Sequence, residues 1–199
     1  PQQQCGLDAI ATLMPSPAVS YFASDFNYFQ NMIISLQGLG YITGVSLFAT
    51  PYDWRRSPES DDTHISITQT AELIKTLTGK KTVLLSHSLG NMQALYTLNG
   101  MSQADKDEYI AHYVAIMPPY VGATKAADMF LGDNYFDPFH AGISSREVQA
   151  TSATSTSLYD IIPKPTYSQQ ANEKYMQDLM TRLNAEKLHD PSTPEGLAW

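Results

Sequence analysis

The sequence has 199 residues, 43% of them hydrophobic and 16% charged, which is enough apolar material for one compact domain with a buried core. Twelve Lys and Arg residues stand against twenty Asp and Glu residues, so the formal net charge is −8. This charge has the wrong sign for a protein that binds nucleic acid. The sequence has no apolar run of about 18 residues, so it predicts no membrane span. Its single cysteine, Cys5, has no second cysteine with which to form an internal disulfide.

Over the first 120 residues, segments with the period of a helix alternate with short apolar runs of strand length. The predicted helices cover residues 17–37, 67–77 and 92–98. The predicted strands cover residues 45–49, 82–85 and 113–117. Strands that alternate with helices of this length predict an α/β fold, with a parallel sheet covered by helices on both faces.

The alternation stops after residue 120, and we expect an inserted lid or cap region over residues 121–165. Within it, the small polar tract at 151–157 (Thr-Ser-Ala-Thr-Ser-Thr-Ser) is interpreted as a flexible loop, with part of a mobile lid as the alternative. A last helix is predicted at 169–188. The expected divisions are a core at 1–120, a lid-like insertion at 121–165 and a helix returning to the core at 166–199.

The sequence Ser-His-Ser-Leu-Gly at 86–90 lies between a predicted strand and a predicted helix, which is the setting of a nucleophile elbow. The chain reverses sharply in such an elbow, so only small residues fit two positions before and after the nucleophile. Ser86 and Gly90 meet this requirement. The turn would present the hydroxyl of Ser88 at a helix N-terminus and leave the Leu89 N–H free to bind an oxyanion. We therefore predict a nucleophilic Ser88, with an ordinary serine at a tight turn as the alternative.

A nucleophilic serine needs a histidine base and an acid that orients this base. In proteins with a nucleophile elbow, the acid and then the histidine follow the serine along the chain. By this chain order alone, Asp160 with His189 is the best pair within the sequence. His189 follows a predicted helix rather than a strand, which argues against a complete small esterase built on this pair. The other histidines lack the spacing of a metal site and no Gly-rich phosphate loop is present, so we expect neither a metal nor another cofactor.

Four short motifs follow one another along the chain. They are Tyr-Asp-Trp-Arg at 52–55, Leu-Leu-Ser-His-Ser-Leu-Gly-Asn at 84–91, Pro-Pro-Tyr-Val-Gly-Ala at 118–123 and Leu-Gly-Asp-Asn at 131–134. In this order the motifs resemble the lecithin:cholesterol acyltransferase family, with its lysosomal phospholipase A2 and phospholipid:diacylglycerol acyltransferase relatives. The resemblance implies an α/β-hydrolase fold with a lid, a Ser-Asp-His triad, and transfer of a fatty acyl group from a phospholipid to water or to a lipid alcohol.

Residue by residue, the resemblance implies that Ser88 is the nucleophile and Leu89 the second oxyanion-hole residue. It also implies that Asp53 and Arg55 form a salt bridge near the active-site entrance, with solvated loop charges as the alternative. The implied partners are a phospholipid, a sterol or diacylglycerol acceptor, and transient contact with a membrane or lipoprotein surface. The resemblance favours a secreted or a lysosome- or vacuole-like location.

The resemblance also implies that parts of the family pattern lie outside this sequence. The other oxyanion N–H of the family comes from a Pro-Gly-Phe-Gly-like strand end just before residues 6–8, and its catalytic Asp and His lie beyond the last long helix. We therefore expect a fragment that lacks N- and C-terminal strands, or a second chain that carries the triad Asp and His. The alternative from another class is a catalytically inactive, hydrolase-like structural subunit of a larger assembly.

Overall fold

The computed structural model describes residues 5–12, 28–131, 144–163, 177 and 181. The chain divides into two compact units. The first unit comprises Pro1–Asp53 and Pro58–Pro118, and the second comprises Trp54–Ser57 and Pro119–Trp199. Both strands of the described part belong to the first unit, together with helices, so this unit has an α/β fold.

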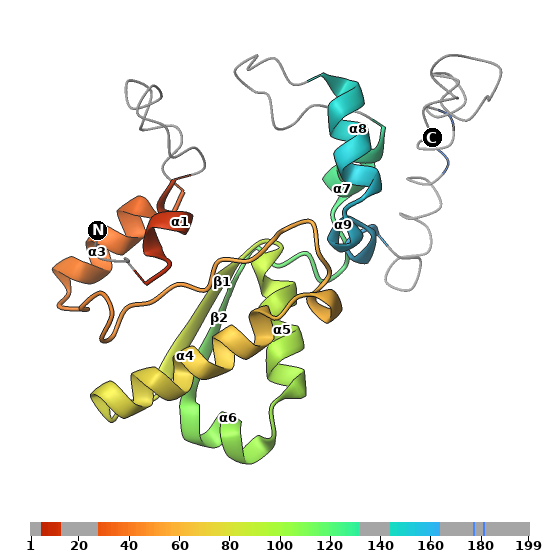
Figure 1. Cartoon of the computed structure of the whole chain (residues 1–199). Helices are drawn as coiled ribbons and strands as arrows, with labels where there is room; N and C mark the ends of the chain where they lie inside the picture. The colour runs from red at the N-terminus through yellow and green to blue at the C-terminus, as the bar shows by residue number, and fades with distance from the viewer. Residues whose placement is uncertain (1–4, 13–27, 132–143, 164–176, 178–180, 182–199) are drawn as a thin grey trace. The chain divides into compact units, whose positions relative to one another are not determined.

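The described sheet consists of two parallel strands, β1 (Thr82–His87) and β2 (Ile110–Ile116), which lie side by side in Figure 1. In the register of this pair, Leu84 lies beside Tyr113 and Ser86 lies beside Ala115. The connection between the strands contains two helices, α5 (Gly90–Gly100) and α6 (Gln103–Tyr109), as a parallel pair requires a crossover. The strands predicted at 82–85 and 113–117 and the helix predicted at 92–98 are thereby confirmed, whereas α6 was not predicted.

Helix α4 (Thr63–Thr78) confirms the helix predicted at 67–77 and packs against α5 and β1 (Figure 1). Its apolar face buries Ile67 and Ala71. The helix ends at Gly79, whose φ of 69° lies in the left-handed region that glycine adopts without strain. The Gly79 N–H donates to the Lys75 carbonyl, which is a common way to close a helix.

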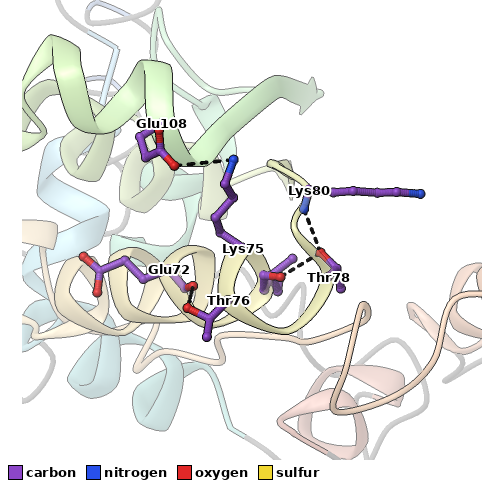
Figure 2. A network of polar contacts seen from close by, with 7 residues as sticks. Glu72, Lys75, Thr76, Thr78, Lys80 and Glu108 are labelled. Atoms are coloured by element: carbon purple, nitrogen blue, oxygen red, sulfur yellow. Dashed lines mark hydrogen bonds and ion pairs between the residues drawn. The ribbon is translucent and has the colours of Figure 1, made fainter.

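Figure 2 shows the polar contacts at this end of α4. The Thr78 hydroxyl donates to the Ile74 carbonyl at 2.7 Å and accepts the Lys80 N–H at 3.1 Å. Lys75 Nζ lies 3.4 Å from Glu108 Oε1 of α6. Both members of this ion pair are in contact with solvent, so we expect it to stabilise the fold by less than about 1 kcal/mol.

The two faces of the strand pair differ in their surroundings. Side chains of Ser86 and Tyr113 on one face reach α5 through hydrogen bonds to Asn91. On the other face Val83 is 50% exposed, and Leu85 and Val114 are exposed as well. The described helices therefore cover one face, and helices on both faces remain a prediction.

The N-terminal part of the first unit forms a small core of its own. Helices α1 (Leu7–Ala11) and α3 (Gln30–Gly38) bury Leu7, Ala11 and Ile33 against each other. Helix α3 confirms the last part of the helix predicted at 17–37 and ends one residue later, whereas the earlier part of that prediction lies largely outside the described residues.

The prediction of a strand at 45–49 is wrong. The segment begins in a turn, because Gly44 adopts a φ of 77° and the Ile42 carbonyl accepts the N–H groups of residues 45, 46 and 47. The Ser46 hydroxyl also accepts the Ile42 N–H at 2.9 Å. These local hydrogen bonds occupy backbone groups that a strand would use for its ladder.

In the second unit the described elements are helices: α7 (Thr124–Phe130), α8 (Ser145–Ala153) and α9 (Thr156–Asp160). The interpretation of residues 151–157 as a flexible loop is wrong, because this tract closes α8 and opens α9, with three of its serines buried. The helix predicted at 169–188 lies outside the described residues, apart from 177 and 181. The lid role of 121–165 remains a prediction.

Candidate functional site

Ser88 lies between the end of β1 and the start of α5, with a φ of 50°. This left-handed conformation is uncommon for a residue with a side chain and costs of order 1–3 kcal/mol, so the surrounding contacts must hold it in place. The Ser88 N–H donates to the Ile116 carbonyl of β2 at 2.9 Å, and the Ser88 carbonyl accepts the Asn91 N–H at 3.0 Å. The sharp strand-to-helix reversal predicted at 86–90 is therefore present.

Ser88 is half-buried. Within the part of the chain that the structure describes, no group forms a hydrogen bond with Ser88 Oγ. Leu89 precedes α5 as its N-cap residue, and no described group accepts its N–H. Free N–H groups at a helix N-terminus carry partial positive charge, so this end of α5 is suited to stabilise an anion beside Ser88.

The side chain of Asn91 is fully buried and holds the elbow by hydrogen bonds. Its Nδ2 donates to the Ser88 carbonyl at 2.8 Å and to the Ile116 carbonyl at 3.0 Å. Its Oδ1 accepts the hydroxyls of Ser86 at 2.8 Å and Tyr113 at 2.9 Å. One amide side chain thus joins the turn to both strands and uses its donor and acceptor groups on protein partners.

The His87 side chain packs against aromatic residues beside the elbow. Its Nδ1 forms a hydrogen bond with the Tyr28 hydroxyl, and its ring meets those of Tyr28 and Phe29 edge to face. Burial raises the pKa of the Tyr28 hydroxyl above its ordinary value. These contacts are typical of a packed aromatic cluster.

Tyr52 lies next to Gly90. A methyl group at position 90 would lie 3.6 Å from Tyr52 Oη and 3.8 Å from Ser86 Cβ, which are ordinary contact distances. A small residue therefore fits here. Burial raises the pKa of the Tyr52 hydroxyl to about 12, and the nearby Tyr28 adds to this shift.

The pairings expected for the remaining predicted site residues stay predictions. Asp53 closes a segment of the first unit, whereas Arg55 belongs to the second unit, so their ion pair remains a prediction. Asp160 ends α9, and His189 lies outside the described residues, so the pairing of these two residues also stays untested.

Among the described residues, no three His, Cys, Asp or Glu side chains gather in a way that would hold a metal ion. None of the described helices combines the length and the apolar character needed to cross a bilayer.

Asn91 and Tyr113 are the site residues that sequence reasoning did not single out for a role. The available signal was a polar side chain directly after the elbow glycine, at the first turn of a helix that packs on a sheet. A polar group at such a position is buried, so it must find partners.

A parallel strand, a turn with a left-handed serine and a following helix define an α/β protein with a candidate nucleophile at the strand end. Comparison with known proteins then gives the family. The family model for lecithin:cholesterol acyltransferase matches residues 4–191, and the chain belongs to this family.

The chain is similar to enzymes of two names. It is 32% identical over 192 residues to the lysosomal phospholipase A and acyltransferase of Homo sapiens, covering 86% of this chain and 46% of that protein. It is 32% identical over 168 residues to the protein of the same name from Rattus norvegicus, covering 77% and 40%. It is 29% identical over 134 residues to the phosphatidylcholine-sterol acyltransferase of Gallus gallus, covering 66% and 32%. The chain thus spans less than half the length of these relatives.

Proposed function

We propose that this chain forms the nucleophile-bearing part of a lipid acyl hydrolase or acyltransferase with an α/β-hydrolase fold. The observation that carries the proposal is the left-handed Ser88 between a parallel strand and a helix, at φ 50°. Membership of the lecithin:cholesterol acyltransferase family supports the same activity, because the similar proteins are named as a phospholipase and acyltransferases.

In the proposed reaction, Ser88 Oγ attacks the carbonyl carbon of a phospholipid ester while a base takes the hydroxyl proton. The negative charge that develops on the carbonyl oxygen is stabilised by the Leu89 N–H and the N-terminus of α5. When the tetrahedral intermediate collapses, the ester bond to the lysophospholipid breaks and the leaving alkoxide receives the proton. The acyl group then remains on Ser88 as an ester.

In the second half of the reaction, the base takes a proton from water or a lipid alcohol, whose oxygen attacks the carbonyl carbon of this ester. The bond from the acyl group to Ser88 Oγ then breaks, Oγ receives the proton, and a fatty acid or a new lipid ester is released. In this proposal, the access of water to the site decides whether water or an alcohol is the acceptor. A lid over 121–165 that shields the site from water favours the alcohol. A phospholipid donor and a sterol or diacylglycerol acceptor fit this chemistry. The substrate lies in a lipid surface, so the proposal includes transient contact with such a surface. We place Asp53 and Arg55 as an ion pair at the entrance.

In this proposal the base and the acid come from outside residues 1–199, either from another part of the same protein or from a second chain. A secreted or lysosome-like location is part of the same proposal.

The test is active-site labelling of the complete protein that contains these 199 residues. The protein is treated with a fluorophosphonate, and the adduct is mapped by mass spectrometry. We expect an adduct on Ser88 that is lost in Ser88→Ala and retained in Ser86→Ala, because Ser86 Oγ is already hydrogen-bonded to Asn91. Phosphatidylcholine vesicles, with and without a sterol, then separate fatty acid release from acyl transfer.

Two results would count against the proposal. If the complete protein shows no adduct at all, the chain is an inactive structural subunit instead. If the 199-residue chain labels by itself and His189→Ala abolishes the labelling, the chain is a complete small esterase that uses Asp160 and His189.

A further inference from the structure

The small polar tract at 151–157 binds the backbone of a segment that lies about 100 residues earlier in the sequence. The Ser157 hydroxyl donates to the Trp54 carbonyl, and the Ser157 N–H donates to the Arg55 carbonyl at 3.3 Å. The Thr156 hydroxyl accepts the Ser57 N–H at 2.8 Å and donates to the Arg55 carbonyl at 3.4 Å. Two adjacent residues therefore hold the backbone of this segment at three positions, Trp54, Arg55 and Ser57.

The remaining hydroxyls of the tract have a different use. Ser152 Oγ donates to the Val148 carbonyl and Ser155 Oγ donates to the Thr151 carbonyl, so both bond within their own helical turn. Ser152 is 0% exposed and Ser157 is 1% exposed. Ser152 and Ser157 are thus equally buried but bond to different partners. Within this tract, Thr156 and Ser157 form the hydrogen bonds to the segment Trp54–Ser57 described above.

The segment that is held carries two arginines whose side chains stay exposed, Arg55 and Arg56. Its backbone is fixed at three positions, whereas both arginines are exposed residues. The hydrogen bonds restrict the backbone dihedrals of the segment, and this restriction limits the positions that the arginine side chains can take.

We propose that Thr156 and Ser157 are positioning residues that fix the backbone of Trp54–Ser57 and thereby set where Arg55 meets the substrate. We call this pair the loop clamp. Its effect on substrate entry rests on the proposed function, in which Arg55 lies at the entrance. Its effect on the segment itself depends on the hydrogen bonds alone, so the two parts are tested separately.

The first test does not require activity. Trypsin cleaves after arginine, and the clamp should protect the bonds that follow Arg55 and Arg56 by holding this backbone out of an extended, cleavable form. We expect Ser157→Ala and Thr156→Val to speed cleavage at these two sites about fivefold, since each removes at least one hydrogen bond. Ser152→Ala is the matched control, because it removes an equally buried hydroxyl that bonds only within α8.

The second test measures turnover of phosphatidylcholine vesicles by the complete protein. We expect Thr156→Val to raise KM about fivefold with little change in kcat, and Thr156→Ser to restore the original KM because it keeps the hydroxyl. The effect should disappear in an Arg55→Ala background, since the clamp acts through Arg55.

The outcomes separate the two ideas. If Thr156→Val and Ser152→Ala give equal cleavage rates at Arg55 and Arg56, the loop clamp is refuted whatever the activity of the protein. If cleavage rises as expected but KM is unchanged, or changes equally in the Arg55→Ala background, the positioning role is refuted. If Ser88 does not label, the proposed function fails, and the cleavage rates still decide whether the clamp holds its segment.

Discussion

Replacing Asn91 with alanine tests whether this side chain holds the elbow. The change removes four hydrogen bonds at a fully buried position, two from Nδ2 and two to Oδ1. At about 1 kcal/mol for each bond, the upper estimate is about 4 kcal/mol. The Ser88 and Ile116 carbonyls each keep a backbone partner, so fewer groups are left unsatisfied. We therefore expect the free energy of unfolding to fall by about 3 kcal/mol.

The assay is urea unfolding of the complete protein, with Asn99→Ala as the matched control. Asn99 lies on the same helix and is exposed, so its replacement should change the free energy of unfolding by less than about 0.5 kcal/mol. With a urea dependence of about 2 kcal/mol per molar, Asn91→Ala should lower the midpoint by about 1.5 M relative to this control.

Tyr113→Phe provides a graded check, because it removes the bond between the Tyr113 hydroxyl and Asn91 Oδ1 and keeps the ring. We expect a loss of about 1 kcal/mol. If Asn91→Ala destabilises the protein no more than Asn99→Ala does, the reasoning about the elbow is refuted.

Two further predictions concern strained and buried groups. Gly122 has a φ of 97°, and a Cβ there would lie 2.5 Å from the Pro163 backbone. Gly122→Ala should therefore lower the free energy of unfolding, measured by thermal unfolding, by about 2 kcal/mol or more. In the control Gly100→Ala, the added Cβ meets no atom within 4 Å, so this change should be neutral or stabilising. The Tyr52 pKa of about 12, against an ordinary 10.0, favours the neutral hydroxyl in the folded state. Its stabilising contribution is therefore present below about pH 10 and should fall by about 2 kcal/mol towards pH 12; equal alkaline sensitivity of Tyr52→Phe in urea unfolding would contradict this.

Much of the first unit could be predicted from the sequence because its elements carry clear physical signals. Ile67 and Ala71 repeat at a helical spacing, and Gly79 marks the stop, so α4 was identified together with its end. The strand β1 and helix α5 flank Ser88, as the apolar run at 82–85 and the helical spacing of apolar residues over 92–98 predicted. The signal was strong where periodicity and a turn residue agreed.

The failures have equally specific causes. The apolar run at 45–49 has no period that separates a strand from a turn, and the Ile42 carbonyl captures its first N–H groups. The tract at 151–157 reads as a loop by composition, but its hydroxyls bond to carbonyls of the preceding turn or of Trp54–Ser57. Helix α6 was overlooked although Ser102 accepts the Asp105 N–H, a common N-cap pattern.

The turn at Ser88 and Leu89 was predictable, because the local spacing of small residues determines it, and the roles of the two residues stay predictions. Asn91 was not predictable in the same way, because its partners Tyr113 and Ile116 lie on a strand more than 20 residues further along the chain. Contacts of this kind depend on the tertiary fold, which a local pattern does not contain.

At position 88 the requirements of stability and of the proposed reaction conflict, because the positive φ there suits a residue without a side chain. Glycine would occupy this backbone conformation more comfortably, yet it would lack the oxygen that the proposed reaction needs. A lineage released from the need for catalysis would gain stability by losing the serine. Glycine at the position equivalent to 88 would then be the mark of a family member that survives as a scaffold.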